Sequence, residues 1–169
     1  MAKSWRTAGI ERARQRYNAG MSASELYQRI VLEHSRAPHH FGALAAPTHR
    51  AEGANPLCGD TLYVELRVVD GRVAEVAFRG EACAIAKATA SMLGEAAARL
   101  DADGVGQLEA RFARVIGGDL ERDDTLGDLN ALAALANYPS RRKCALLPFA
   151  TLRAALAGTA KTTTEGEHR

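Results

Sequence analysis

The sequence predicts an α+β fold in which a small antiparallel sheet carries helices packed on one face. Hydrophobic residues alternate with a period of two through the middle of the chain, and they recur with helical spacing before and after it. The order helix, strands, helices is typical of α+β domains and lacks the alternation of strand and helix found in parallel sheets. A length of 169 residues fits one compact domain with short extensions.

A first helix is predicted to begin after Ser22. Ser22 can cap its N-terminus, and Glu25 three residues later completes the capping-box pattern. Apolar residues then recur on one face from Leu26 to Val31. Pro38 ends the helix, because a proline disfavours helical backbone in the residue before it. The following Pro-, Gly- and His-rich stretch, 39–50, is predicted to be a loop that runs into an edge strand.

A β-hairpin with one buried face is predicted next. Apolar and polar residues alternate from Leu62 to Val68, and the alternation returns from Val73 to Phe78. The Asp70-Gly71 pair between these runs is a tight-turn signal. The two runs are therefore expected to pair as antiparallel strands.

Helical spacing accounts for the rest of the predicted domain. Gly117 and Gly118 end one helix. The last helix is predicted to begin between Pro139 and Ala145 and to end near Leu156. Pro148 favours a start near Cys144, because a proline is tolerated in the first helical turn but not in the interior. The other predicted helices cover approximately residues 85–100, 105–116 and 129–135.

The predicted organisation has three parts: a flexible basic extension (1–20), a single domain (21–157) and a disordered tail (158–169). The extension lacks the apolar core of a secretory signal, although its arginine content leaves a mitochondrial transit peptide as an alternative. With 22 basic and 20 acidic residues, the chain lacks the charge imbalance typical of nucleic-acid binding. No apolar run approaches the roughly 20 residues of a membrane span. We therefore expect neither nucleic acid nor a membrane as partner.

Three cysteines, Cys58, Cys83 and Cys144, are the residues that most suggest chemistry. An odd number excludes a closed set of intramolecular disulfides, and the low density of cysteines indicates a reducing, cytoplasmic compartment. Each cysteine lies at the end of a predicted element, where functional groups are often placed. Cys83 is expected at a helix N-terminus and Cys144 follows a basic run, and both settings favour a thiolate.

Asp60 lies two residues after Cys58 and supplies a fourth potential ligand. Three sulfurs and one carboxylate can form a tetrahedral site for zinc or hold an iron–sulfur cluster. The spacing of the cysteines matches no zinc-finger pattern, so spacing alone favours three unrelated thiols. The alternative for Asp60 is a residue that only caps the turn at the entry of the hairpin. His39 and His40 are either further ligands or a solvated pair in a loop, and His34 is expected to be a packed histidine.

The sequence around each cysteine resembles that of a known family. The three motifs are Asn-Pro-Leu-Cys-Gly-Asp at 55–60, Gly-Glu-Ala-Cys-Ala-Ile at 80–85 and Arg-Arg-Lys-Cys-Ala-Leu-Leu at 141–147. Together and in this order they resemble the NifU-like/IscU-like iron–sulfur cluster assembly proteins, and the resemblance extends over about residues 24–156.

Within this family the chain looks most like the SufU branch. Residues 117–129 resemble the insertion of that branch, and Lys143 stands where the IscU branch has a histidine. Arg141 also matches the SufU pattern. Ala82 and Ala86 depart from the glycine and serine usual in the family, which affects the fine geometry beside the site.

The resemblance implies an IscU/SufE-like fold with a metal site at one end, formed by Cys58, Asp60, Cys83 and Cys144. It implies a zinc-bound, sulfurtransferase-like acceptor that takes persulfide sulfur from a SufS-like cysteine desulfurase within the SUF assembly machinery. Cys58 is the expected acceptor, because its glycine-containing loop can move. Arg141 is either the contact with the desulfurase or part of a solvated helix start. Two alternatives remain: a scaffold that assembles a [2Fe–2S] cluster on the same ligands, and a binding module in which zinc only stabilises the fold.

Overall fold

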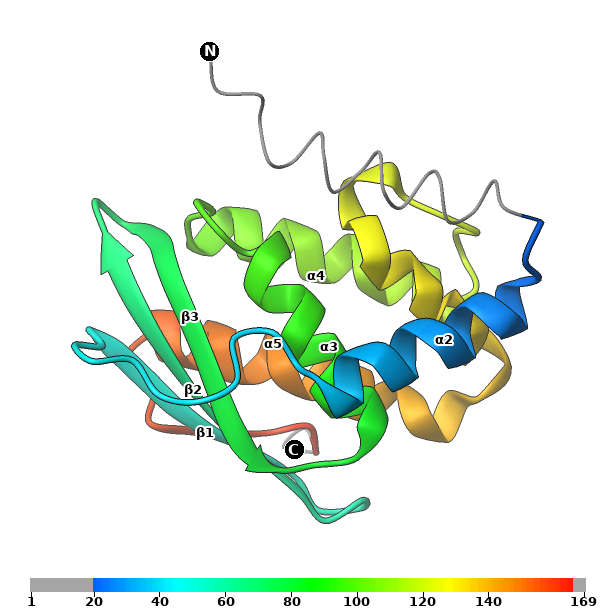
Figure 1. Ribbon diagram of the computed structural model, residues 1–169. Coiled ribbons are helices and arrows are strands. Elements are labelled where there is room, and N and C mark those ends of the chain that lie inside the picture. The colour runs from blue at the N-terminus through cyan, green and yellow to red at the C-terminus, as the bar shows by residue number, and fades with distance from the viewer. Residues whose placement is uncertain (1–19, 166–169) are drawn as a thin grey trace.

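The computed structural model describes residues 20–165 and confirms the predicted α+β class (Figure 1). Helices pack on one face of a four-stranded sheet. In this part of the chain, no helix is both long enough and apolar enough to cross a membrane. The elements are α2 (Ala23–Arg36), β1 (His49–Asn55), β2 (Asp60–Val69), β3 (Arg72–Glu81), α3 (Ala84–Ala96), α4 (Ala102–Gly117), the 3₁₀ segments η1 (Asp124–Asn137) and η2 (Pro139–Arg141), α5 (Arg142–Leu156) and β4 (Lys161–Thr163).

The sheet has the strand order β3-β2-β1-β4. β1 pairs antiparallel with β2, and β2 pairs antiparallel with β3 across the predicted Asp70-Gly71 turn. β4 pairs parallel with β1, so the sheet is mixed rather than purely antiparallel.

Strand β4 corrects the prediction of a disordered tail over 158–169. Residues 161–163 are polar and carry no hydrophobic pattern. Their strand is instead held by backbone pairing: the Glu52 N–H donates to the Ala160 carbonyl at 2.8 Å, and the Thr164 N–H donates to the Ala54 carbonyl at 3.1 Å. The predicted basic extension, apart from Gly20, and residues 166–169 of the predicted tail lie outside the described residues.

Capping residues set the boundaries of two helices. At α2 the predicted capping box is confirmed, with the Glu25 N–H donating to the Ser22 hydroxyl at 3.2 Å and the Ser22 N–H donating to the Glu25 carboxylate at 2.8 Å. Asp101 caps α4 by accepting from the Gly104 N–H at 2.8 Å. Gly118 ends α4 in the left-handed conformation, with a φ of 88°.

Helix α5 lies against β1 and β2. It begins at Arg142, within the predicted range, and Pro148 lies in its second turn rather than its first. Because proline has no N–H, it cannot donate to the carbonyl of Cys144 four residues earlier. Gly53 in β1 allows α5 to approach closely, since a Cβ at this position would overlap the hydroxyl of Thr151.

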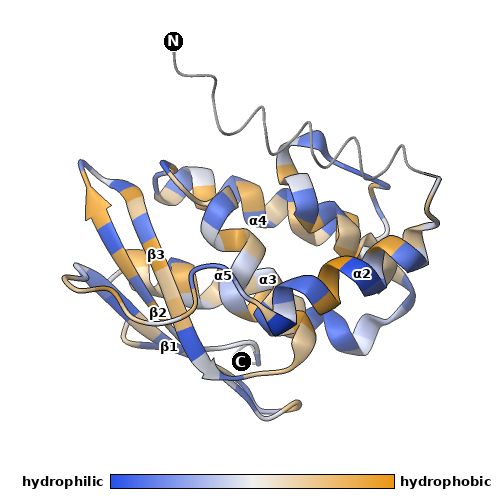
Figure 2. Ribbon diagram, viewed as in Figure 1, coloured by the Kyte–Doolittle hydropathy of each residue, from blue (hydrophilic) through white to orange (hydrophobic). Residues whose placement is uncertain are grey.

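The alternation of apolar and polar residues separates the two faces of the sheet, as the colouring of β3 shows (Figure 2). Phe78 faces the core as predicted, and there Phe112 of α4 stacks on Phe149 of α5 with ring centroids 4.9 Å apart. Glu65 is buried although its β2 neighbours point to the core on the opposite face. The loop before β1 contacts it, and the Leu44 N–H donates to its carboxylate at 2.9 Å.

One edge of the sheet is a short strand, and the other is partly covered by the loop before β1. β4 lies along β1 at one edge. At the other edge, the Gly42 N–H donates to the Phe78 carbonyl at 2.8 Å, and the Phe78 N–H donates to the His40 carbonyl at 2.9 Å. The ring of Phe41 packs edge-on against that of Phe78, with centroids 5.4 Å apart.

Candidate metal centre

The loop between β1 and β2 brings two of the predicted ligands to one end of the sheet. β1 ends at Asn55 and β2 begins at Asp60, and these two residues are partners in the strand register. The Cys58 N–H donates to the Asn55 carbonyl at 3.2 Å, which closes the turn. Gly59 has a left-handed φ of 69°, a conformation that glycine adopts at little cost. Cys58 is thereby presented on the exposed side of a tight loop.

Asp60 points inward and is only 4% exposed. One carboxylate oxygen, Oδ1, accepts from the backbone N–H of Cys83 at 2.8 Å. The other oxygen, Oδ2, is buried and has no hydrogen-bond partner among the described residues. An unpaired buried carboxylate oxygen is costly, and a bound cation would compensate that cost.

The other two cysteines lie at helix N-termini. Cys83 is the N-cap of α3, and its sulfur accepts from the Ala86 N–H at 3.5 Å. Cys144 is the third residue of α5 and is 2% exposed. Arg142 ties the start of α5 to the end of η1, because its guanidinium donates to the Ala136 carbonyl at 2.7 Å. Both cysteines therefore lie in the first turn of a helix or at its N-cap, where the helix dipole favours an anion.

Side chains from the hairpin loop and from α5 converge. The sulfurs of Cys58 and Cys144 are 3.1 Å apart. Donor atoms of Cys58, Asp60 and Cys144 all lie within 4.8 Å of one another, so these three side chains could hold a metal ion. Cys83 is outside this group of three, although its thiol is close enough to Cys144 to affect the ionisation of that residue. The hydrogen bond from Ala86 is compatible with a ligand role, since metal ligands are commonly hydrogen-bonded themselves.

Burial dominates the ionisation of the two helix-terminal thiols. It raises the pKa of Cys144, and the neighbouring thiols of Cys58 and Cys83 raise it further. Burial also raises the pKa of Cys83, which the Ala86 N–H partly offsets. Without a cation, these thiols are therefore protonated at neutral pH. A metal ion would displace their protons, because the thiolate is the form that binds metals.

The donor set fits a thiophilic metal. Thiolates with one carboxylate suit zinc or an iron–sulfur cluster better than magnesium or calcium, which prefer oxygen ligands. The carboxylate of Asp60 supports a bound cation, because one of its oxygens has no partner among the described residues and the residue lies in the same group of donors as the two sulfurs.

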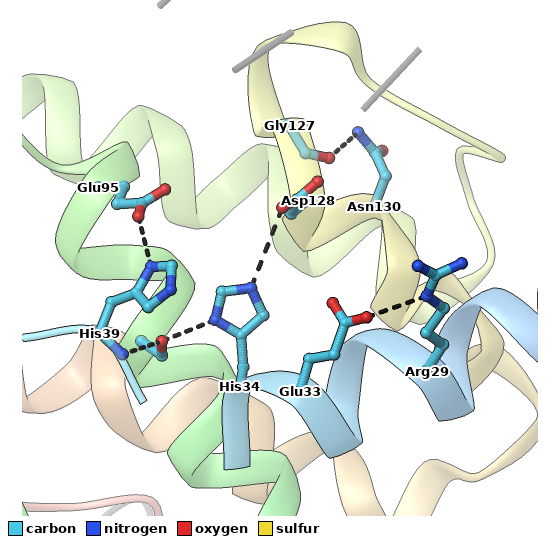
Figure 3. A network of polar contacts seen from close by, with 9 residues as sticks. Arg29, Glu33, His34, His39, Glu95, Gly127, Asp128 and Asn130 are labelled. Carbon is cyan, nitrogen blue, oxygen red and sulfur yellow. Dashed lines mark hydrogen bonds and ion pairs between the residues drawn. The ribbon is translucent and has the colours of Figure 1, made fainter. Parts of the chain in front are cut away.

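The histidines of residues 34–40 do not belong to this centre. His34 is buried as predicted, with its Nδ1 2.7 Å from the Ser91 hydroxyl (Figure 3). The side chain of His39 is half exposed and its Nδ1 lies 2.6 Å from the carboxylate of Glu95. The group of metal-ligating side chains found among the described residues contains no histidine.

Three exposed side chains come from the segments that carry the site. Leu57, beside Cys58, is 70% exposed, and Tyr138 is exposed as well. Arg141 is exposed at the start of α5. Burial raises the pKa of Tyr27, and the charge of Arg141 opposes this shift, so the two side chains lie near each other. The sequence did not single out Leu57 or Tyr138.

The chain is similar to proteins of a known family. The family model for the NifU-like N terminal domain matches residues 26–145. The chain is 29% identical over 134 residues to the iron–sulfur cluster assembly scaffold protein IscU of Streptococcus pyogenes serotype M1, covering 79% of this chain and 84% of that protein. It is 30% identical over 143 residues to the zinc-dependent sulfurtransferase SufU of Bacillus subtilis, covering 83% of this chain and 95% of that protein.

A solved structure shows the same fold. The N-terminal part of a NifU-like protein from Brucella abortus superposes with a TM-score of 0.72 at 23% identity, covering 82% of this chain and 97% of that structure. The identities with the IscU and SufU proteins are nearly equal, so overall similarity does not separate these two branches.

Proposed function

Because the chain belongs to the family of NifU-like N-terminal domains, we propose that it is a zinc-binding sulfur acceptor of the SufU kind, serving a cysteine desulfurase in iron–sulfur cluster assembly. The observation that carries this proposal is the convergence of Cys58, Asp60 and Cys144, with Cys58 exposed and the other two buried. One sulfur can therefore meet a partner while the remaining donors stay in place.

The ligands we assign to zinc are Cys58, Asp60, Cys83 and Cys144. Bound zinc would keep its cysteine ligands deprotonated at neutral pH. Asp60 is the only oxygen donor of the four. It also orients Cys83 by accepting from that residue's backbone N–H. A mixed sulfur and oxygen set differs from the closed Cys/His sets of structural zinc sites, which supports exchange of a ligand during function.

Cys58 is assigned as the acceptor. Its thiolate attacks the outer sulfur of a desulfurase persulfide, and a new S–S bond forms on Cys58 while the original S–S bond breaks. The desulfurase cysteine leaves as a thiolate, and Cys58 carries the persulfide, so no external oxidant or reductant is needed. The exposed position of Cys58 in the loop gives such a partner access.

Lys143 supports the SufU assignment over the IscU alternative, because it precedes Cys144 where the resemblance to the IscU branch would require a histidine.

The second candidate function is a scaffold that assembles a [2Fe–2S] cluster on the same ligands. Three cysteine sulfurs near one carboxylate are chemically suited to that role too. Anaerobic reconstitution with iron and sulfide distinguishes the two, since a scaffold develops visible charge-transfer absorption and a zinc acceptor stays colourless.

A desulfurase assay tests the proposal. The protein should raise turnover of a SufS-like desulfurase on cysteine, and mass spectrometry should find added sulfur on Cys58. Cys58→Ala should abolish both effects. If Cys58→Ala still stimulates the desulfurase, the acceptor assignment is wrong.

Arg141→Glu tests the docking role that we propose for Arg141. This exposed arginine should be required for stimulation but not for zinc binding. Arg72→Glu is the matched control, because Arg72 is also exposed but lies at the β2–β3 turn, at the opposite end of the strands from Cys58. Equal stimulation by both variants would contradict the docking role.

A further inference from the structure

Asn55 is a completely buried polar residue that neither the ligand set nor the sulfur-transfer step uses. Its side-chain Nδ2 lies 3.6 Å from the sulfur of Cys144 and donates to it. Its Oδ1 is buried and has no hydrogen-bond partner among the described residues. Asparagine is seldom buried in this way without a specific role, because an unpaired polar atom destabilises the fold.

The position of Asn55 is set by the backbone on two sides. It is the last residue of β1 and the register partner of Asp60. Its carbonyl also accepts from the Cys58 N–H in the loop. The Asn55 side chain therefore starts from a fixed backbone position beside Cys58 and Asp60, and it reaches a further proposed ligand, Cys144.

The three thiols are not equivalent in their hydrogen bonds. Cys144 accepts from Asn55, and Cys83 accepts from the Ala86 N–H. In residues 20–165, the sulfur of Cys58 has a hydrogen-bond contact only with that of Cys144. An N–H donor stabilises a thiolate and lowers its nucleophilicity. Cys58 is thus both the most exposed and the least restrained of the three sulfurs.

We propose that Asn55 is a positioning residue that anchors the sulfur of Cys144 in the metal centre and thereby confines sulfur acceptance to Cys58. Confinement of sulfur acceptance to Cys58 rests on the proposed function. The first half, anchoring of Cys144, concerns the metal centre alone and is measured without a desulfurase.

A purely structural role predicts different behaviour. If Asn55 only filled space, leucine would pack there equally well and would remove an unpaired buried oxygen. The metal-free Asn55→Leu variant should then be at least as stable as the wild type, and its zinc binding should be unchanged. Anchoring also predicts a stable metal-free variant, but with weakened zinc retention and an accessible Cys144.

The experiment compares zinc-loaded wild type, Asn55→Leu and Asn55→Asp. Asn55→Asp keeps the shape but replaces the donor with an acceptor, so it should have the larger effect. Zinc retention is measured against a chromogenic chelator, and alkylation by iodoacetamide is mapped to each cysteine by mass spectrometry. Loss of a second-shell hydrogen bond should weaken zinc binding by about 10- to 100-fold. Alkylation of Cys144 relative to Cys58 should rise by about tenfold or more.

Thr151→Val is the matched control. Thr151 is also buried between β1 and α5, but its hydroxyl donates to the Leu147 carbonyl rather than to a sulfur. Unchanged zinc retention and unchanged protection of Cys144 in Asn55→Leu would overturn the inference. Equal changes in Thr151→Val would overturn it too, because they would indicate general loosening of the interface. Failure of the wild type to stimulate a desulfurase would instead overturn the proposed function.

Discussion

The substitution Asp60→Asn separates the metal-ligand role of Asp60 from the turn role. Asparagine keeps the shape of the side chain, and its Oδ1 can still accept from the Cys83 N–H, as the carboxylate does at 2.8 Å. The change removes the negative charge and replaces Oδ2, the buried oxygen without a partner. If Asp60 is a metal ligand, the variant should bind zinc more weakly without losing stability in the metal-free protein. If Asp60 only supports the turn, the metal-free variant should lose stability and zinc binding should be unchanged.

The structure sets the expected magnitudes. In the metal-free protein, exchange of a buried, uncompensated carboxylate for a neutral amide should raise the free energy of unfolding by about 1 kcal/mol, since an unpaired polar group costs about 1–3 kcal/mol and a charged one costs more. In the zinc-bound protein, loss of a direct ligand should weaken binding by about 100-fold or more, because loss of an outer-shell contact alone costs 10- to 100-fold. A factor of 100 corresponds to about 2.7 kcal/mol. Saturating zinc should thus stabilise the variant less than the wild type.

Urea unfolding with and without zinc, together with chelator competition, measures both quantities. Glu81→Gln is the matched control, because Glu81 is an exposed carboxylate at the end of β3 whose register partner is next to Asp60. It should leave zinc affinity within about threefold of the wild type. If Asp60→Asn binds zinc as tightly as the wild type, Asp60 is not a ligand. If the metal-free variant is strongly destabilised, the turn role is the dominant one.

Three further predictions concern packing and ionisation. Gly53→Ala should lower the free energy of unfolding by about 1–3 kcal/mol through overlap with Thr151, and Thr151→Ala should partly restore it in a double-mutant cycle measured by urea unfolding. The Leu44 N–H holds the pKa of Glu65 below its ordinary value of 4.5, so stability from this contact is present above pH 4.5 and is lost as the pH falls through the lower folded-state pKa. Glu65→Gln should therefore flatten the decline in stability below pH 4.5, and an equal slope in both proteins would contradict the assignment. Because burial raises the pKa of the two helix-terminal thiols, zinc affinity should rise between pH 6 and 8 by about tenfold per pH unit for each thiol that ionises, which calorimetry in buffers of different ionisation enthalpy can check.

Local signals explain the parts of the fold that the sequence predicts well. The capping box at Ser22 and the alternation of residues on either side of Asp70-Gly71 depend on neighbouring residues only. The capping box and the antiparallel pairing are confirmed, but a bulge between Arg67 and Val68 interrupts the period of two. Strand β4 has no such signal, because residues 161–163 are polar and gain their structure by pairing with β1 far earlier in the chain. The start of α5 at Arg142 lies within the predicted range, although Pro148 favoured a start near Cys144.

In the candidate site, too, local motifs predict some features and tertiary packing determines the others. The motifs identify Cys58, Asp60 and Cys144, but the approach of their donor atoms depends on α5 packing close to β1, which no local pattern encodes. Asn55 was not recognised as a functional residue, because an asparagine before a proline is most simply a turn signal. Only its complete burial and its contact with Cys144 reveal a further role.

The short edges of the sheet have a consequence at high protein concentration. An open strand edge is a template on which further copies of a chain can stack into fibrils. Here one edge is the three-residue strand β4, and the segment at 40–42 pairs with β3 at Phe78. A short or interrupted edge offers few adjacent backbone groups to another chain, so this sheet is a poor template for stacking.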